Sequence, residues 1–178
     1  EKGKWYKAND FPKSNWNFRK WLWVPVLRFF GIMKISVFRH LVVISGTGVG
    51  GGSLVYANTL PIPKTAFYKS GSWANLADWE TELKPHYKEA LRMLGATKNP
   101  KLFDADKGLQ AVAKELKIEN KFDRTDVAVY FGEENVTKKD PYFNGEGPDR
   151  TGCNFCGACM TGCRNNSKNT LDKNYLHL

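Results

Sequence analysis

The stretch of sequence that decides the fold reads ISVFRHLVVIS (35–45), GTGVGGG (46–52) and SLVYAN (53–58). The first part is rich in β-branched residues, which predicts a strand. The glycines predict a tight loop, because glycine adopts positive φ without steric cost. Residues 53–58 predict a short helix that begins on this loop and is ended by Pro61 and Pro63. We therefore expect a strand, a glycine loop and a short helix in direct succession.

The glycine loop has the formal spacing G-x-G-x-x-G at Gly46, Gly48 and Gly51. A dinucleotide-binding fingerprint also needs a long helix and an acidic residue about 20 positions later. Here the two prolines end the helix early, and the next acidic residue is Asp78, at the start of another predicted helix. The pattern is therefore not that fingerprint. A loop that approaches a bulky ligand and a simple flexible turn remain the two interpretations.

Further elements follow from the apolar periodicity of the chain. Helices are predicted at 78–94, 104–117 and 170–178, and a strand at 125–131. Asp78 and Asp104 are predicted N-caps, and Gly95 is a predicted C-terminal stop. Pro85 either kinks the first helix or divides it in two. The combination predicts an α+β fold.

Composition excludes several classes of protein. The chain has 178 residues, 42% of them hydrophobic and 25% charged, which is typical of a globular protein. The formal net charge is +9, but residues 1–40 alone hold nine of the 27 basic residues and two of the 18 acidic ones. A nucleic-acid binder usually spreads its charge over one face of the molecule. We therefore expect no nucleic-acid partner.

The N-terminal segment 1–40 is aromatic as well as basic, and its longest apolar stretch runs from Trp21 to Met33. A membrane-spanning helix needs about 20 apolar residues, so this stretch is too short, and no secretory signal is visible. We expect it to pack on the body of the protein or to form a hydrophobic lip that contacts a membrane peripherally. Arg19, Lys20 and Arg28 would favour anionic lipid in the second case.

All four cysteines lie close together, at Cys153, Cys156, Cys159 and Cys163, with the spacing C-x2-C-x2-C-x3-C. This spacing is typical of [4Fe–4S] ligands in bacterial ferredoxins. Arg164 follows where ferredoxins have proline, and no second set of cysteines is present. Zinc, structural thiols and disulfides are therefore alternatives. Cysteines clustered in this way indicate a reducing compartment, so we expect a cytoplasmic protein.

Two further motifs are informative, VGGGSLVYANTL (49–60) and NSKNTLDKNYL (166–176). Both resemble segments of one known family, the glucose-methanol-choline (GMC) oxidoreductases, and especially its cholesterol-oxidase-like branch. The first resembles the flavin-contacting loop of that family, and the helical segment between the two motifs is also similar. The resemblance covers residues 41–178 well and residues 1–40 poorly.

The resemblance implies an FAD-dependent enzyme that oxidises an alcohol, sterol-like or otherwise apolar, by hydride transfer to the flavin. The residues that match the flavin loop are Gly50, Gly51, Gly52, Ser53, Tyr56, Ala57, Asn58 and Thr59. The family often has Asn-Gly where this chain has Tyr56 and Ala57, so either Tyr56 or Asn58 is expected to supply a polar contact to the flavin edge. The cysteines alone suggest a different class, an iron–sulfur electron-transfer module.

The family's nucleotide fingerprint and catalytic histidine lie outside the matching region, and His40, His86 and His177 match no catalytic position. We therefore expect an internal fragment that holds part of the FAD-binding domain and part of the substrate domain, with no catalytic residue of its own. The expected division is a basic aromatic segment (1–40), the flavin loop (41–60), a helical substrate-side region (61–150), and the cysteine cluster with the start of the next helix (151–178).

Overall fold

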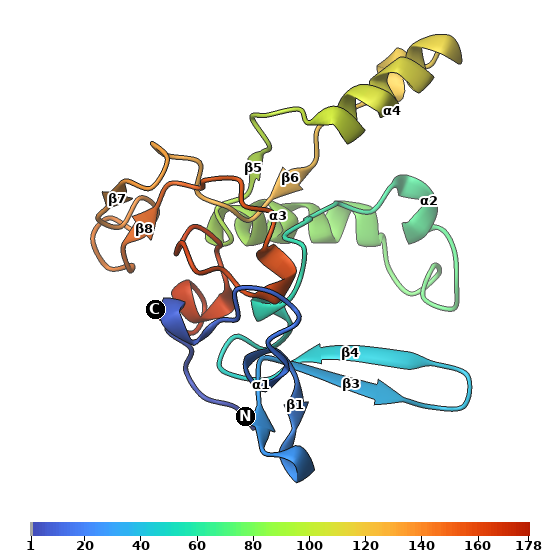
Figure 1. Cartoon of the computed structure of the whole chain (residues 1–178). Helices are drawn as coiled ribbons and strands as arrows, with labels where there is room; N and C mark the ends of the chain where they lie inside the picture. The colour runs from blue at the N-terminus through green and yellow to red at the C-terminus, as the bar shows by residue number, and fades with distance from the viewer. Residues whose placement is uncertain (1) are drawn as a thin grey trace.

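The computed structural model describes residues 2–178 and combines helices with antiparallel strand pairs (Figure 1). The α-helices are α1 (Phe18–Trp21), α2 (Thr65–Tyr68), α3 (Trp79–Met93) and α4 (Asp104–Glu115). The strands are β1 (Trp23–Val24), β2 (Phe29–Phe30), β3 (Met33–Val37), β4 (Val42–Gly46), β5 (Thr97–Lys98), β6 (Asp126–Val127), β7 (Thr137–Lys138) and β8 (Arg150–Thr151). Short 3₁₀ turns are η1 (Ala8–Asp10), η2 (Pro25–Leu27), η3 (Gly51–Leu54), η4 (Glu119–Lys121), η5 (Cys159–Thr161) and η6 (Leu171–Lys173). The mixed α and β content agrees with the prediction.

The single strand predicted at 35–45 is wrong, because this region is an antiparallel hairpin of β3 and β4. Ile35 pairs with Ile44, and Val37 pairs with Val42. The chain reverses between them, where the Phe38 N–H donates to the Leu41 carbonyl at 2.8 Å. β-Branched composition indicates extended backbone but does not locate a turn that carries no glycine or proline. The hairpin extends well away from the rest of the molecule (Figure 1).

The two long helices are confirmed. α3 begins after Asp78, whose carboxylate accepts the Thr81 N–H, and it runs unbroken through Pro85. It stops before Gly95, which has the positive φ of +57° that ends many helices. At α4 the predicted cap is wrong: Asp104 is already helical, and the Asp106 carboxylate accepts the Phe103 N–H at 2.8 Å.

Two predicted elements are much shorter than expected. The strand expected at 125–131 is reduced to β6, which pairs with β5. The helix expected at 170–178 is reduced to η6, because Asn174 leaves the helical region with φ −140° and ψ −99°. Its side-chain oxygen accepts the N–H of Tyr175 at 2.7 Å, a local contact that competes with helix continuation. The short helix expected at 53–58 is the 3₁₀ turn η3.

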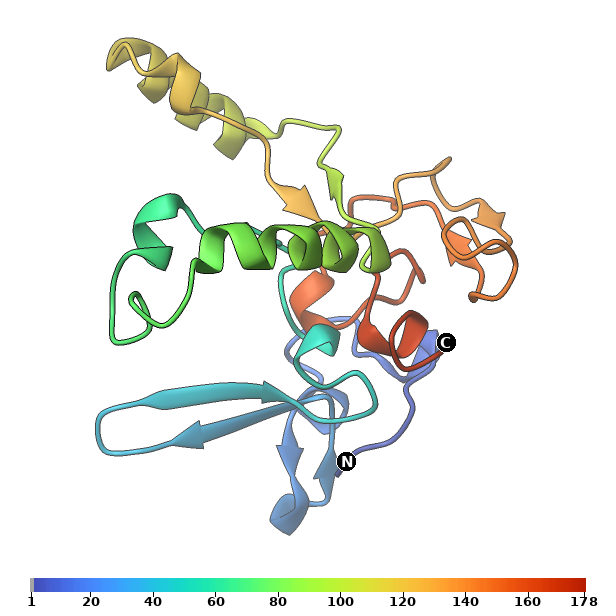
Figure 2. The same cartoon turned by 180° about the vertical axis from the view of Figure 1, so that it is seen from behind.

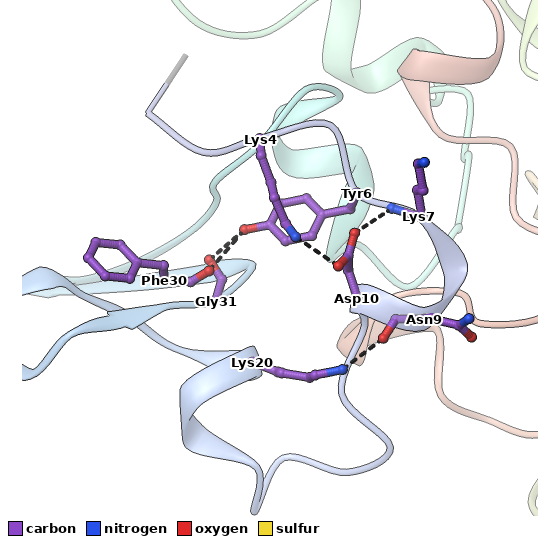
Figure 3. A network of polar contacts seen from close by, with 8 residues as sticks. All are labelled: Lys4, Tyr6, Lys7, Asn9, Asp10, Lys20, Phe30 and Gly31. Atoms are coloured by element: carbon purple, nitrogen blue, oxygen red, sulfur yellow. Dashed lines mark hydrogen bonds and ion pairs between the residues drawn. The ribbon is translucent and has the colours of Figure 1, made fainter.

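The hydrophobic core joins the N-terminal segment to the glycine region. It contains the buried side chains of Tyr6, Phe11, Ile32, Met33, Leu54 and Val55. Tyr6 donates its hydroxyl to the Gly31 carbonyl at 3.0 Å, and Lys4 pairs with Asp10 (Figure 3). The Val49 N–H donates to the Lys4 carbonyl at 3.1 Å. The start of the chain therefore supports the glycine loop from one side.

The C-terminal segment lies against the other side of the glycine region, where η6 contacts η3 (Figure 2). The hairpin β3–β4 and helix α4 both extend away from this central part. Within residues 2–178, no helix has the length and apolar character needed to cross a bilayer.

Candidate functional site

The glycine loop leaves β4 at Gly46 and turns into η3 through three glycines with positive φ. These are Gly48 at +131°, Gly50 at +107° and Gly51 at +52°. A Cβ on Gly46 would lie 2.0 Å from the Gly51 carbonyl oxygen, so the loop folds back onto the end of its own strand. Only glycine permits this path at both the strand end and the turn.

The outer face of the loop is open at Gly51 and Gly52. A Cβ built on either residue meets no atom of the described residues within 4 Å. Position 52 also has an ordinary φ, so neither packing within this chain nor backbone conformation requires a glycine there. A bare backbone beside open space is the arrangement that lets a flat ligand approach the peptide groups closely.

The hydroxyl of Ser53, a predicted flavin contact, bonds within the protein. Its Oγ donates to the Gly50 carbonyl at 2.6 Å and accepts the Leu171 N–H at 2.9 Å. Ser53 therefore fixes the shape of the glycine loop and ties it to the C-terminal segment.

Tyr56 is similarly turned inward. Its hydroxyl donates to the Asn169 carbonyl at 3.2 Å, and burial raises the pKa of its phenol. The sequence predicts that either Tyr56 or Asn58 contacts the flavin edge, and in this structure the Tyr56 hydroxyl is satisfied inside the fold.

After the glycines, the loop has one more residue with a positive φ, and this residue is Asn58. Its φ is +68°, whereas Ala57 keeps an ordinary conformation. Asparagine tolerates the left-handed region better than other residues with a Cβ, which explains how the chain manages without glycine here. The Asn58 carbonyl accepts the Ala128 N–H at 3.0 Å, and Thr59 forms a bridge with Val127. The end of the loop is therefore held by the segment around β6.

Lys168 is a central residue for which the sequence analysis predicts no role. It is fully buried, and its Nζ donates to the carbonyls of Leu54 at 3.0 Å, Tyr56 at 2.9 Å and Cys159 at 2.8 Å. Burial lowers the pKa of this ammonium to about 8. Three charge-assisted bonds from one side chain join the glycine region, the cysteine loop and the C-terminal segment.

Arg150 is the second buried cation near the site. Its Nε donates to Asn169 Oδ1 at 2.8 Å, and its Nη2 donates to the Lys173 carbonyl at 2.9 Å. The carboxylate of Asp172 is also buried, and its Oδ1 has no hydrogen-bond partner among the described residues. That oxygen lies 3.1 Å from where a Gly50 Cβ would be, directly behind the glycine loop. The motif 166–176 pointed to this segment, but nothing in the sequence indicated that its charges are buried.

The four cysteines are free thiols around one cavity, and the structure does not support the iron–sulfur expectation. Cys153, Cys159 and Cys163 are partly buried and Cys156 is exposed. Across residues 2–178, no three histidine, cysteine or acidic side chains are arranged to hold a metal ion. The cysteine loop curls tightly, with positive φ at Phe155, Gly157 and Gly162. The loop wraps around a cavity that all four cysteines line, and none of these thiols forms a disulfide.

The three histidines belong to elements other than the glycine loop. His40 is in the turn of the β3–β4 hairpin, His86 is on the exposed side of α3, and His177 follows η6.

Comparison with known proteins gives a consistent picture. The GMC oxidoreductase family matches residues 31–178. The chain is 50% identical over 181 aligned positions to a cholesterol oxidase of Acinetobacter baumannii, covering 99% of this chain and 33% of that protein. It is 46% identical over 183 positions to a cholesterol oxidase of Mycobacterium tuberculosis, covering 100% of this chain and 32% of that protein.

The similarity extends further toward the N-terminus than the two motifs indicated, because residues 1–40 also align with these relatives. The chain spans about a third of the length of the curated relatives that it matches. A family match over most of the chain, with about half the residues identical to these relatives, shows that the chain belongs to the GMC oxidoreductases, and in particular to cholesterol-oxidase-like members of that family.

Proposed function

We propose that this chain is part of an FAD-dependent enzyme that oxidises an alcohol, and that its glycine loop forms one wall of the flavin site. The observation that carries the proposal is the open backbone at Gly51 and Gly52, where a Cβ would meet no atom within 4 Å. This bare surface lies within the region that belongs to the GMC family. FAD, when bound, would supply the acceptor for the hydride that leaves the carbinol carbon.

The chain's own residues would shape and support that wall. Gly50, Gly51 and Gly52 would present their backbone to the flavin. Ser53 and Tyr56 would hold the loop from behind, through their bonds to Gly50, Leu171 and Asn169. Ala57, Asn58 and Thr59 would continue the surface toward the substrate side. No catalytic residue is proposed in this segment.

The substrate is proposed to be an apolar alcohol of the sterol-like kind. The relatives that align over the whole chain are described as cholesterol oxidases, and this description supports the substrate class for the complete enzyme. We also propose the division of the chain into a flavin-loop part (41–60), a substrate-side part (61–150) and a return to the flavin domain (151–178).

A peripheral membrane contact belongs to the same proposal, because an apolar alcohol resides in lipid. The turn between β1 and β2 carries Val26, which is 92% exposed, and Leu27, which is 60% exposed. Arg28 follows directly, and Arg19 and Lys20 lie on the neighbouring helix α1. Exposed apolar side chains beside basic ones are typical of an interfacial lip.

Replacing Gly52 tests the flavin wall. Gly52→Ala places a methyl group in the open space without a clash inside the chain, so the apoprotein should keep its melting temperature. FAD binding to the full-length enzyme, measured by quenching of flavin fluorescence, should weaken by at least about tenfold, because a methyl in the wall prevents close approach.

Gly108→Ala is the matched control. Gly108 lies in α4, and a Cβ there also meets nothing within 4 Å. This variant should bind FAD like the wild type. Equal FAD affinity of Gly52→Ala and Gly108→Ala would show that the loop is not the flavin wall.

A further inference from the structure

Three basic side chains gather behind the glycine loop. Arg150 and Lys168 are fully buried, and Lys173 is partly buried. The Lys173 Nζ donates to the Lys168 carbonyl at 3.2 Å, and the Lys173 carbonyl accepts a hydrogen bond from Arg150 Nη2 at 2.9 Å. These contacts link the three residues to one another, and we call Arg150, Lys168 and Lys173 the buried cation cluster.

The hydrogen bonds of the buried cation cluster go to neutral oxygens. Lys168 donates to three backbone carbonyls, and Arg150 donates to the side-chain oxygen of Asn169 and to three further carbonyls. The ion pairs within residues 2–178 join other side chains, each at least 31% exposed. Buried charges are usually paired with an opposite charge, because removing a charge from water is costly. The positive charge of this cluster is therefore satisfied by hydrogen bonds without being neutralised.

The carboxylates nearby offset only part of that charge. Asp172 is buried beside the cluster, but it forms no ion pair with it within residues 2–178. Asp140 and Asp149 also act on Arg150. Asp149 is exposed, and the Asp140 carboxylate already accepts four backbone N–H groups of its own loop. Three cations beside one buried carboxylate leave an excess of positive charge.

This excess charge lies directly behind the glycine loop. Lys168 Nζ donates to the carbonyl of Leu54, the last residue of η3, and Asp172 Oδ1 lies 3.1 Å from the position of a Gly50 Cβ. The turn η6, which contains Asp172 and Lys173, contacts η3. Water is excluded here, so the charges are weakly screened and act across the loop on a group bound at its open face.

We propose that the buried cation cluster raises the reduction potential of the flavin by stabilising its reduced form through the glycine loop. FAD accepts a hydride, so its reduced form carries more negative charge than its oxidised form. The proposal rests on the flavin wall proposed above and assigns a role to the residues behind that wall. Arg150, Lys168 and Lys173 are positioning residues, because they act through the loop, and Asp172 acts in the opposite direction.

Two variants should therefore shift the potential with opposite signs. Asp172→Asn removes the buried negative charge with little change of shape, so the potential should rise by about 30 mV, a tenfold change for a two-electron couple. Lys173→Met removes a positive charge, so the potential should fall by a similar amount. The potential is measured by equilibration of the FAD-loaded full-length enzyme with reference dyes at pH 6.5, below the Lys168 pKa of about 8.

Asp149→Asn and Lys114→Met are the matched controls. Each removes the same kind of charge from an exposed position. Solvent and salt screen exposed charges, so both controls should leave the potential close to that of the wild type.

The sign of the shifts separates an electrostatic role from a structural one. A general disturbance of the loop would move both variants in the same direction, and that result would overturn the proposal. If Lys173→Met does not fold, the expected rise in Asp172→Asn decides alone.

FAD affinity, measured on the same variants, identifies the anionic group that the cluster serves. Weaker FAD binding with unchanged potentials would mean that the cluster serves the phosphates of FAD, and would overturn the proposal. Normal FAD binding with unchanged potentials would also overturn it and would leave the flavin wall intact. The wall itself is decided separately by Gly52→Ala.

Discussion

Lys168 shows how a single residue determines the shape of the candidate site. Its ammonium holds the carbonyls of Leu54 and Tyr56, which follow the glycine loop, and the carbonyl of Cys159 in the cysteine loop. Leu54 is 114 positions away in the sequence. No local pattern reports such a contact, so a lysine in a polar stretch looks like a surface residue until the chain is folded.

Replacing Lys168 by methionine should destabilise the protein, because one buried and two partly buried carbonyls lose their donor. We expect a loss of about 2–4 kcal/mol in the free energy of unfolding, measured by urea denaturation of the full-length enzyme. Lys114→Met, on the exposed side of α4, is the control and should change stability by less than about 0.5 kcal/mol. The same loss in both variants would contradict the role of Lys168.

The difference in unfolding free energy between the wild type and Lys168→Met should depend on pH. The pKa of Lys168 is about 8 in the folded protein, against the ordinary value of 10.5. Between these values the unfolded state binds more protons, so raising the pH favours the folded state. The stability of the wild type relative to Lys168→Met should therefore increase from pH 8 to pH 10. A difference that stays constant or falls over this range would contradict the buried, charged assignment.

Among the elements, the short turn η2 between β1 and β2 is the candidate membrane contact. Val26→Ser combined with Leu27→Ser should reduce co-sedimentation of the full-length enzyme with vesicles of phosphatidylcholine and phosphatidylserine. Removing two side chains that bury apolar area in lipid should lower partitioning by about tenfold or more. The basic residues nearby are unchanged, so the attraction to anionic lipid is kept.

A matched pair, Leu109 on α4 and Leu116 directly after it, controls for general loss of hydrophobicity. Leu109 and Leu116 are 62% and 61% exposed, and their replacement by serine should leave sedimentation unchanged. If the η2 and α4 variants lose binding equally, the turn has no specific role.

Elements with a strong local signal are those that the sequence predicts well. α3 has a regular apolar face, an N-cap at Asp78 and a stop at Gly95, and the structure has all three. The β3–β4 region has β-branched residues on both sides of its turn, so composition predicts extension and misses the reversal. The spacing of the four cysteines along the chain shows only that their sulfurs could reach one metal cluster. Whether the sulfurs are arranged to hold a metal depends on how the loop folds, and in residues 2–178 no such arrangement is present.

Within the glycine region, the sequence predicted the loop and its glycines, while the roles of its polar residues required the fold. Ser53 and Tyr56 bond to residues 171 and 169, which are far away in the chain. Propensities contain no information on such distant partners, so a hydroxyl that holds the loop looks the same as one that contacts a ligand.

For the whole molecule, the hairpin β3–β4 is the clearest sign of a larger assembly. Val42, Val43 and Ile44 are consecutive and exposed, so both faces of β4 present apolar side chains to solvent. A run of this kind is typical of a strand covered on both faces. The relatives that match this chain are about three times longer, and we expect other parts of the full-length enzyme to cover the hairpin.

Hydrogen exchange measures this covering directly. Amides of residues 35–44 should exchange much more slowly in the full-length enzyme than in the isolated 178-residue chain, because burial of both strand faces suppresses local opening. The amides that bond between β3 and β4 are the most informative, because these cross-strand hydrogen bonds exist in both samples. The two samples then differ only in whether other parts of the enzyme cover the hairpin. Amides of η1, which lies between the core residues Tyr6 and Phe11, provide the internal reference and should change less. Equal exchange of the hairpin in the two samples would mean that its apolar faces stay exposed in the complete enzyme.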